Sequence, residues 1–309
     1  MCIFSRPIEL VFGTRILCSS LTDARHSTVY QMAYQAQVDV AMVLPVPVRP
    51  GMGDDALSFV DLSNYEEFFD DLDRCFPPRV VLIHGKNGGY GGKRIEQPRP
   101  KLLVHSIGNY IASYVPSFDD FDRLEECFRL PAAAWETLPD YSQYGFAVFQ
   151  LQPGKEKKKI HPIAYHYPPA HPGELFFPTA HLHEGGRATA LADFDHSLYA
   201  QTPDSDRYRT VYDWEDSIDL PRSRMNVAKI NGLLRETYRV RRLMLKGVFP
   251  NADLVLKAPD PASHNHVDYQ TEARLARVPL DLGPSLRWGR FRDLALGTVN
   301  PGSSSAGRY

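Results

Sequence analysis

The chain has 309 residues, enough for one large domain or two ordinary ones, and 43% hydrophobic with 23% charged residues is typical of a folded globular protein. With 35 basic and 37 acidic residues the formal net charge is −2, which excludes a strong overall attraction to nucleic acid or acidic membranes. The sequence has no apolar run long enough to span a membrane and its start lacks the features of a signal peptide, so we expect a cytoplasmic location.

The first third of the chain is rich in residues that favour strands. Residues 2–19 predict a hairpin with its turn at Gly13, and residues 28–35 and 38–46 predict a second pair of strands. A cluster of prolines is expected to end this second ladder, because proline cannot donate a hydrogen bond to it. Residues 64–75 carry apolar side chains at helical spacing and predict a helix.

The pattern of this helix recurs later in the chain. The segment Phe69–Phe76 (FDDLDRCF) matches Phe121–Phe128 (FDRLEECF), and a strand ending in proline is predicted before each. The repeat predicts two related strand–helix modules, at about residues 28–77 and 101–131. The alternative is that two unrelated amphipathic helices share a common pattern.

Strands dominate again in the second half, and a helix is predicted over residues 224–238. The predicted fold class is therefore α+β: β-rich, with antiparallel sheets and a few short helices. We expect one β-rich domain over residues 1–256, followed by a polar, proline-rich extension at 257–309 whose end is disordered. The later strands are expected at 144–151, 160–167, 175–183, 239–245 and 252–256.

The most unusual stretch is Ile160–Gln201, which contains six of the 11 histidines. Alternate residues of a strand share one face, so His181 and His183 would point the same way. A turn at Glu184–Gly186 would bring the chain back as the second strand of a hairpin and place His196 near this pair.

This arrangement predicts a catalytic metal site. Imidazole is the commonest ligand of transition metals in proteins, and catalytic sites typically combine three protein ligands with one open position. His181, His183 and His196 are the candidate ligands of one divalent ion (zinc, iron or manganese), and Asp195 or Glu184 is the candidate base for a metal-bound water. The alternative is a polar strand face whose histidines are structural.

A second chemical candidate is Cys2. Removal of Met1 would leave its thiol beside a free α-amino group that can act as the base. The opening MCI, followed by a predicted hairpin, resembles the start of the N-terminal-nucleophile hydrolases. This resemblance implies attack by Cys2 on an amide, support from Arg15 on the next strand, and oxyanion donors, for which Asn109 and Asn231 are candidates.

A broader resemblance rests on the segments at 41–47 (AMVLPVP), 144–151 (YGFAVFQL), 175–185 (LFFPTAHLHEG) and 194–201 (FDHSLYAQ). These are similar to an uncharacterised bacterial family of unknown function with an LPVP-type strand module. The resemblance implies a shared β-rich fold and no particular activity.

Two classes of function fit the sequence. The first is a hydrolase acting on a small molecule or peptide through a histidine-bound metal or through Cys2. The second is a non-catalytic binding or scaffold module with structural histidines. In both classes the expected ligand is a small molecule or a peptide, not nucleic acid or a membrane.

Overall fold

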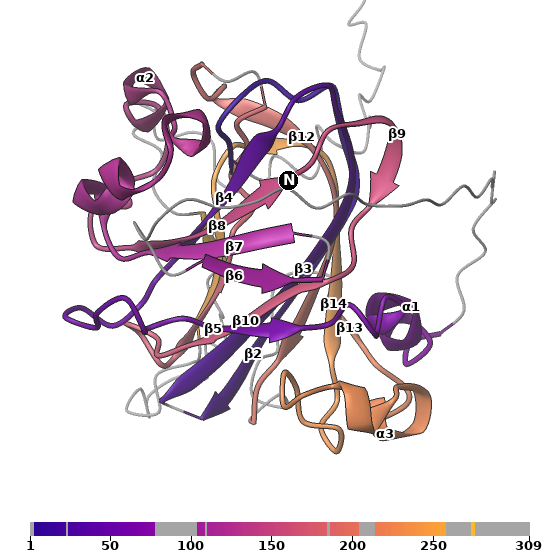
Figure 1. Ribbon diagram of the computed structural model, residues 1–309. Helices are drawn as coiled ribbons and strands as arrows, with labels where there is room; N and C mark the ends of the chain where they lie inside the picture. Colours follow the sequence, from indigo (N-terminus) through magenta and orange to yellow (C-terminus); the bar gives the residue numbers. More distant parts are fainter. Residues whose placement is uncertain are drawn as a thin grey trace, which may run out of the picture.

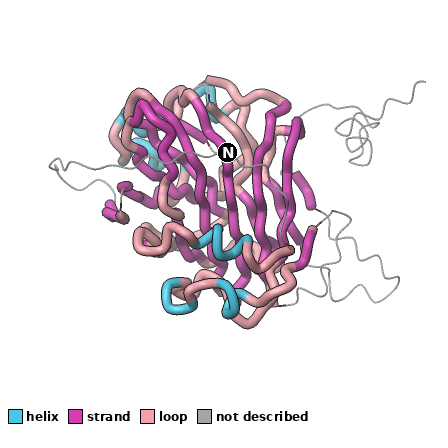
Figure 2. The backbone as a smooth tube through the Cα atoms, turned by 90° about the vertical axis from the view of Figure 1, so that its right-hand side faces the viewer, coloured by secondary structure: helices cyan, strands magenta, loops and turns pink. Residues whose placement is uncertain are grey.

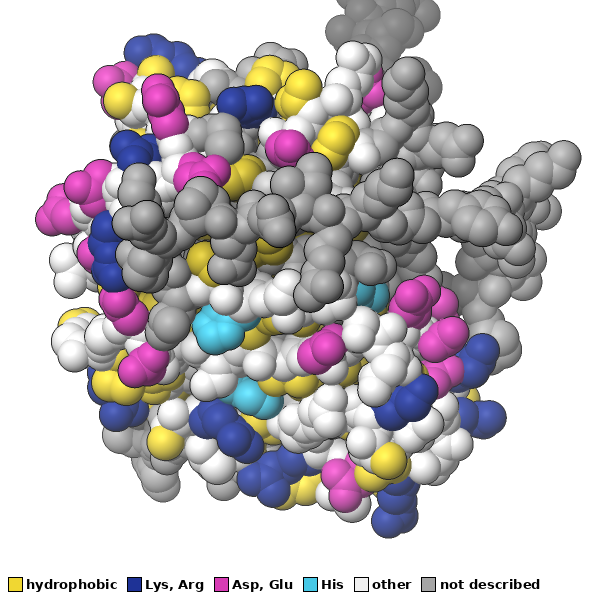
Figure 3. All heavy atoms as spheres, in the orientation of Figure 1, with side chains coloured by type: hydrophobic (Ala, Val, Ile, Leu, Met, Phe, Trp, Pro, Cys, Tyr) yellow, Lys and Arg dark blue, Asp and Glu magenta, His cyan; other side chains and the backbone are white. Residues whose placement is uncertain are grey.

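The structure is a computed structural model that describes residues 3–22, 24–77, 104–108, 110–183, 186–203, 214–257 and 273–275. Two large β-sheets pack face to face, with short helical segments at the outside (Figure 1). On the side of the molecule seen in Figure 3, acidic and basic side chains are interspersed, in keeping with a net charge near zero. The helices of this part of the chain are too short to cross a membrane.

The smaller of the two sheets has five strands. It carries the N-terminal strand at one edge, and all its strand pairs are antiparallel. In spatial order the strands are β1 (Ile3–Phe4), β4 (Val40–Val46), β8 (Gly145–Leu151), β7 (Tyr110–Val115) and β6 (Val104–Ile107).

The larger sheet has eight strands and a single parallel pair, β12 with β2, among the described residues. Its order is β13 (Glu215–Asp216), β14 (Arg241–Pro250), β12 (Leu191–Gln201), β2 (Leu10–Thr22), β3 (Arg25–Ala36), β10 (Ile163–Tyr167) and β5 (Ser58–Asp61), while β9 (Gly154–Lys159) also pairs with β3. A third, three-stranded sheet consists of β11 (Glu174–Phe177), β15 (Leu254–Lys257) and β16 (Ala273–Leu275).

The helical segments are short and cover outer faces of the two large sheets. They are the α-helices α1 (Phe68–Asp73), α2 (Ala132–Trp135) and α3 (Pro221–Arg224), and the 3₁₀ turns η1 (Phe118–Arg123), η2 (Glu126–Phe128) and η4 (Val227–Lys229). Helical turns lie across one end of the long strands of the larger sheet, and none of the described helical segments lies across the other end of that face (Figure 2).

The main core lies between the inner faces of the two large sheets. It is built from alternate residues of their strands, such as Ile16, Tyr30, Met42, Phe149 and Leu198, each at most 1% exposed. Strand β12 illustrates the alternation that produces this core: Phe194, His196 and Leu198 point inward, while the residues between them point outward.

The structure shows a β-rich protein with few short helices, in agreement with the coarse prediction, but it corrects several details. Gly13 is not a hairpin turn. It lies inside the continuous strand β2 with φ of 61°, where the register with β3 shifts in a bulge. Strands β3 and β4 are both present, yet they belong to different sheets, because the chain crosses from one sheet to the other between them.

The predicted helices are also shorter than expected. Residues 224–238 contain the end of α3 and the 3₁₀ turn η4 in place of a long helix. In the second predicted module, residues 121–128 form 3₁₀ turns, whereas the matching residues of the first module belong to α1. The structure therefore does not confirm a repeated strand–helix module.

The first test of this architecture concerns the two sides of β12. Replacing the fully buried Leu198 with alanine is expected to lower the free energy of unfolding by about 2–5 kcal/mol, because it leaves a cavity between the sheets. The matched change Leu191→Ala, at a position 48% exposed on the same strand, is expected to cost no more than about 0.5 kcal/mol. Urea unfolding of both variants measures the difference, and equal losses would contradict the assigned faces.

Candidate functional site

The histidine-rich segment does not fold back on itself as a hairpin. Strand β11 pairs with β15, whereas β12 pairs with β14 and with β2, so the two halves of the segment enter different sheets. Three of its histidines nevertheless meet inside the protein. Tertiary packing brings His196 of β12 against His181, which also stacks on His183; both of these residues follow β11.

The three imidazole rings form a stack in the interior. The ring centroids of His181 and His183 are 5.3 Å apart, and those of His181 and His196 are 5.4 Å apart, with interplanar angles of 13° and 29°. Phe194 contacts His181 at 4.2 Å between centroids, and Phe4 of the N-terminal strand contacts His183 at 5.8 Å. The surroundings of the stack are therefore largely aromatic.

Burial keeps His181 and His183 neutral by lowering the pKa of each. It lowers the pKa of His183 to about 4, and it lowers the pKa of His181 much further, with the neighbouring His183 adding to the effect. The Nε2 atoms of both residues are buried and have no hydrogen-bond partner among the described residues. A protonated imidazole in this position would carry an unsolvated charge.

Two side chains fix the backbone that carries His181 and His183. The amide of Asn251 accepts a hydrogen bond from the His181 nitrogen at 2.7 Å and donates one to the His181 carbonyl at 2.9 Å. The fully buried carboxyl of Asp253 accepts hydrogen bonds from the backbone nitrogens of Thr179 and Ala180 and from the hydroxyl of Tyr141. These contacts give a non-strand segment a defined position in the core.

Acid is expected to destabilise the protein through this stack. Between the pKa of 6.5 for an exposed imidazole and about 4 for buried His183, the unfolded chain binds a proton that the folded protein does not. The contribution of neutral His183 to the free energy of unfolding is therefore fully present above pH 6.5. It decreases towards pH 4 by about 1.4 kcal/mol per pH unit. We expect His183→Phe to show a shallower decrease, measured by urea unfolding across this window.

The carboxyl of Asp253 changes the free energy of unfolding in the opposite direction as the pH falls, so its contribution must be separated from that of His183. Burial raises the pKa of its carboxyl to about 6, so the folded protein binds this proton more readily than the unfolded chain does. The difference between the wild type and His183→Phe cancels this contribution. Parallel stability curves for the two proteins would show that His183 does not titrate as described.

The predicted metal site is not assembled from the described residues. Within them, no group of three or more His, Cys, Asp or Glu side chains is placed to hold a metal ion. Lone pairs of imidazole lie in the ring plane, so nitrogens of stacked rings do not point to a common centre. Asp195, the predicted base, faces the opposite side of β12 and pairs with Lys246 at 3.2 Å, and Glu184 lies outside the described residues.

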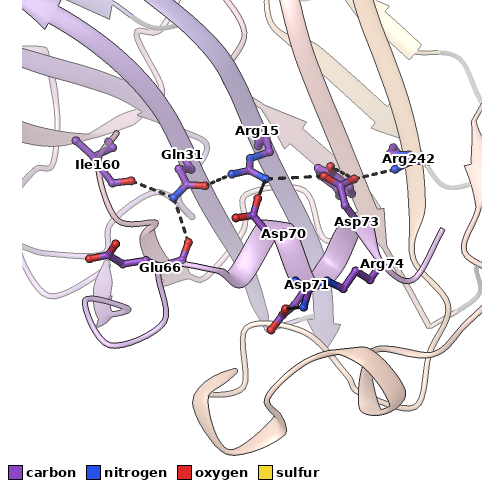
Figure 4. A network of polar contacts seen from close by, with 10 residues as sticks. Arg15, Gln31, Glu66, Asp70, Asp71, Asp73, Arg74, Ile160 and Arg242 are labelled. Carbon is purple, nitrogen blue, oxygen red and sulfur yellow. Dashed lines mark hydrogen bonds and ion pairs between the residues drawn. The ribbon is translucent and has the colours of Figure 1, made fainter. Parts of the chain in front are cut away.

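Only some residues of the predicted thiol site lie within the described part of the chain. Cys2 and Asn109 lie outside the described residues, and Asn231 lies in a turn with φ of 53°. Arg15 on β2 is engaged elsewhere: its guanidinium donates to Asp70 of α1 at 2.5 Å and to Gln31 of β3 at 2.7 Å (Figure 4). This arginine anchors a helix to the sheet in the present structure.

Arg15 belongs to a larger network between α1 and the sheet. Asp73, at the end of α1, accepts a hydrogen bond from Arg242 of β14 at 2.7 Å (Figure 4). It accepts another, also at 2.7 Å, from the hydroxyl of Tyr199 of β12. The side chain of Arg242 is 5% exposed, bonds Glu215 as well, and lies over the ring of Phe76 at 4.2 Å. A buried guanidinium needs such partners, because an uncompensated charge in the interior is costly.

Removal of the carboxylate that Arg242 and Tyr199 share is expected to destabilise the folded protein. Asp73→Ala leaves the buried Arg242 with one acidic partner and Tyr199 without its acceptor, and should lower the free energy of unfolding by about 2–4 kcal/mol. Arg74→Ala is the matched control, because its pair with Asp71 lies at the surface, with the Arg74 side chain 65% exposed. We expect this control to change stability by no more than about 0.5 kcal/mol in urea unfolding. A loss of similar size in both variants would refute the role of Asp73.

A groove of about 320 Å³ opens on the outer face of the larger sheet, beyond the end that α1 covers. Gly13, where β2 bulges, is one of its lining residues, and its surface is mostly apolar. Strands β2, β3, β12 and β14 all contribute to it, with Phe12, Arg15, Gln31, Asp195, Ser197 and Lys246 among the lining residues. Of the residues predicted as catalytic, Arg15 and Asp195 therefore meet here, on the face opposite the histidine stack.

Most of the residues that line this groove were not predicted from the sequence. Asp195 and Ser197 alternate with buried residues along β12, and this period-two pattern was the available signal for an open sheet face. Which strands lie beside β12 depends on the parallel pairing with β2, which no local pattern encodes. Asn251 and Asp253 were missed for the same reason.

No family model matches the sequence. Among solved structures, the crystal structure of baculovirus P35 is similar with a TM-score of 0.44 and 12% identity, over 84% of this chain and 100% of that chain. A 3.1 Å crystal structure of a mutated baculovirus P35 after caspase cleavage gives 0.40 and 14%, over 82% and 100%. A chain of the caspase-8/P35 complex gives 0.41 and 11%, over 80% and 96%. TM-scores this low do not establish a common fold. The resemblances to the N-terminal-nucleophile hydrolases and to the uncharacterised bacterial family stay predictions.

Proposed function

We propose that this chain is a non-catalytic binding protein, in which the histidines are structural and the ligand docks in the groove on the outer face of the larger sheet. The observation that carries the proposal is the division of the candidate residues between the two faces of β12. His196 is fully buried in the stack, whereas Asp195, next to it in sequence, lines the groove.

This division argues against a hydrolase built from the predicted residues. A general base must lie within hydrogen-bond reach of the water or group it activates. Asp195 projects from the opposite side of the sheet and is paired with Lys246, so it cannot serve a water held at the stack. Arg15, in turn, is bonded to Asp70 and Gln31.

Binding of a ligand requires only a suitable surface and no catalytic group, and the groove provides such a surface. Ligand sites are typically concave and largely apolar, with a few polar groups that fix orientation. Here Phe12 and Ala33 provide apolar surface, and Arg15, Gln31 and Lys246 provide the polar groups. The side chains of Lys246 and Asp195 are 61% and 58% exposed in their ion pair, so their charges remain accessible to a ligand.

The test is selection of ligands from a displayed library of random short peptides, followed by affinity measurements on a variant with a filled groove. Ser197→Trp places a large side chain in the groove and should lower the affinity for the selected peptides by about tenfold or more. Ser223→Trp, on the exposed surface of α3, is the matched control and should leave affinity unchanged. Peptides that bind Ser197→Trp as tightly as the wild type would overturn the proposal.

Metal analysis provides an independent test of the structural histidines. Elemental mass spectrometry of untagged protein should find zinc, iron and manganese well below one equivalent, and His183→Phe should not change the metal content. One equivalent of metal that disappears in His183→Phe would restore the metal-dependent hydrolase.

A further inference from the structure

The groove is the centre of a wider apolar surface. Leu10 on β2, Leu191 on β12 and Val248 on β14 are 38%, 48% and 55% exposed. Alternation places all three on the outer face: Leu10 is two residues before Phe12, which lines the groove, and Val248 lies opposite Asp193 in the β12–β14 register. We call this surface, together with the groove, the open face.

Charges of both signs surround the open face. Lys246 and Arg15 each form an ion pair with an aspartate, and Asp193 adds an exposed carboxylate on β12. On the far side of β3, strand β9 contains four lysines, and Lys159 is registered opposite the lining residue Ala33. The sign of the charge therefore does not select an occupant, and the apolar surface and the path of the chain have to do so.

The last described strand brings the chain to one corner of the open face. Leu191, at the start of β12, is registered opposite Pro250 of β14, and β15 begins shortly afterwards at Leu254. Leu254 is in turn registered opposite Leu275, the last residue of β16. Four extended residues span at most about 14 Å and paired strands lie about 4.8 Å apart, so the chain beyond Leu275 starts within roughly 20 Å of Pro250.

The sequence that follows β16 contains an apolar segment at 286–296 (LRWGRFRDLAL), which we call the tail segment. It begins about 11 residues after Leu275, and a chain of that length spans up to about 36 Å, enough to reach Leu191 and to follow β12. Removal of apolar side chains from water favours contact between such a segment and an apolar surface. Its large apolar residues are Leu286, Trp288, Phe291, Leu294 and Leu296.

The covalent link favours the tail segment over other occupants of the open face. A segment tethered by a short stretch of chain has an effective concentration on the order of 1 mM at a site within its reach. A free peptide or a second copy of the protein at about 1 µM would therefore need an intrinsic affinity about 1000-fold higher to displace it.

We propose that the tail segment docks on the open face of its own molecule and competes there with the external ligand. This inference rests on the proposed binding function, because the tail segment regulates access to the same groove. The aromatic side chains of Trp288 and Phe291 occupy the groove, and the leucines of the tail segment contact Leu191 and Val248. An external ligand then binds only when it displaces the tail segment.

The first test is photo-crosslinking of the full chain, with p-benzoylphenylalanine in place of Trp288. Peptide mass spectrometry after irradiation should find cross-links within one molecule to the parts of β2, β3, β12 and β14 that form the open face. The same amino acid in place of Tyr309, outside the tail segment, is the matched control and should give at least tenfold fewer of these cross-links. Cross-links to another surface would overturn the proposal, and cross-links only between molecules would identify a second copy as the occupant and overturn it as well.

The second test measures competition with the peptides selected on the protein. Trp288→Ser, in the full chain, should raise the affinity for these peptides by about tenfold, because the tail segment loses its largest apolar side chain. Tyr309→Ser removes an aromatic side chain outside the tail segment and should leave the affinity unchanged.

The two proposals fail in different ways. Peptides that Ser197→Trp weakens, but that bind the wild type and Trp288→Ser equally, would overturn docking of the tail segment and leave the binding function standing. If Ser197→Trp weakens none of the selected peptides, the binding function is overturned, and competition by the tail segment is overturned with it.

Discussion

The alternation of side chains along β12 is the constraint on which the rest of the structure depends. Neighbouring residues of a strand must point to opposite faces, so His196 and Asp195 cannot serve one site. Since β12 lies in the middle of the larger sheet, its inward residues enter the core between the two sheets and its outward residues face either the helical cover or solvent. The histidine stack and the groove are the two consequences.

The helical cover decides how much of the outer face is left open. Helix α1 is short, and its apolar residues Phe68, Phe69 and Leu72 pack on the sheet around Tyr199. The charged network of Asp70 and Asp73 then holds it against the strands (Figure 4). Beyond this cover the same strands carry exposed apolar and acidic side chains. A sheet face of this kind, open next to a rigid support, is suited to binding because its geometry is fixed before the ligand arrives.

Part of the fold follows from local patterns. The strands at 28–35, 38–46 and 144–151 were predictable because their β-branched and aromatic residues favour extended backbone. Gly13 shows the limit of such patterns: a glycine with positive φ serves equally in a turn or a bulge, and the continued pairing of β2 with β3 selects the bulge. The prediction of a helix at 224–238 was wrong. Its apolar residues Met225, Leu233 and Leu234 do pack in the core on the outer face of the larger sheet, but they do so from short helical segments and turns.

The sequence by itself determined that the chain is β-rich, because strand propensity acts through neighbouring residues. It also showed directly that six of the histidines lie within residues 160–201. Only the tertiary structure decided that three of these histidines form a buried stack, that Arg15 anchors α1, and that Asp195 faces a groove. The physical reason is that pairing between distant strands fixes which residues become neighbours. The parallel pairing of β12 with β2 joins segments far apart in the chain, and no local pattern encodes that choice.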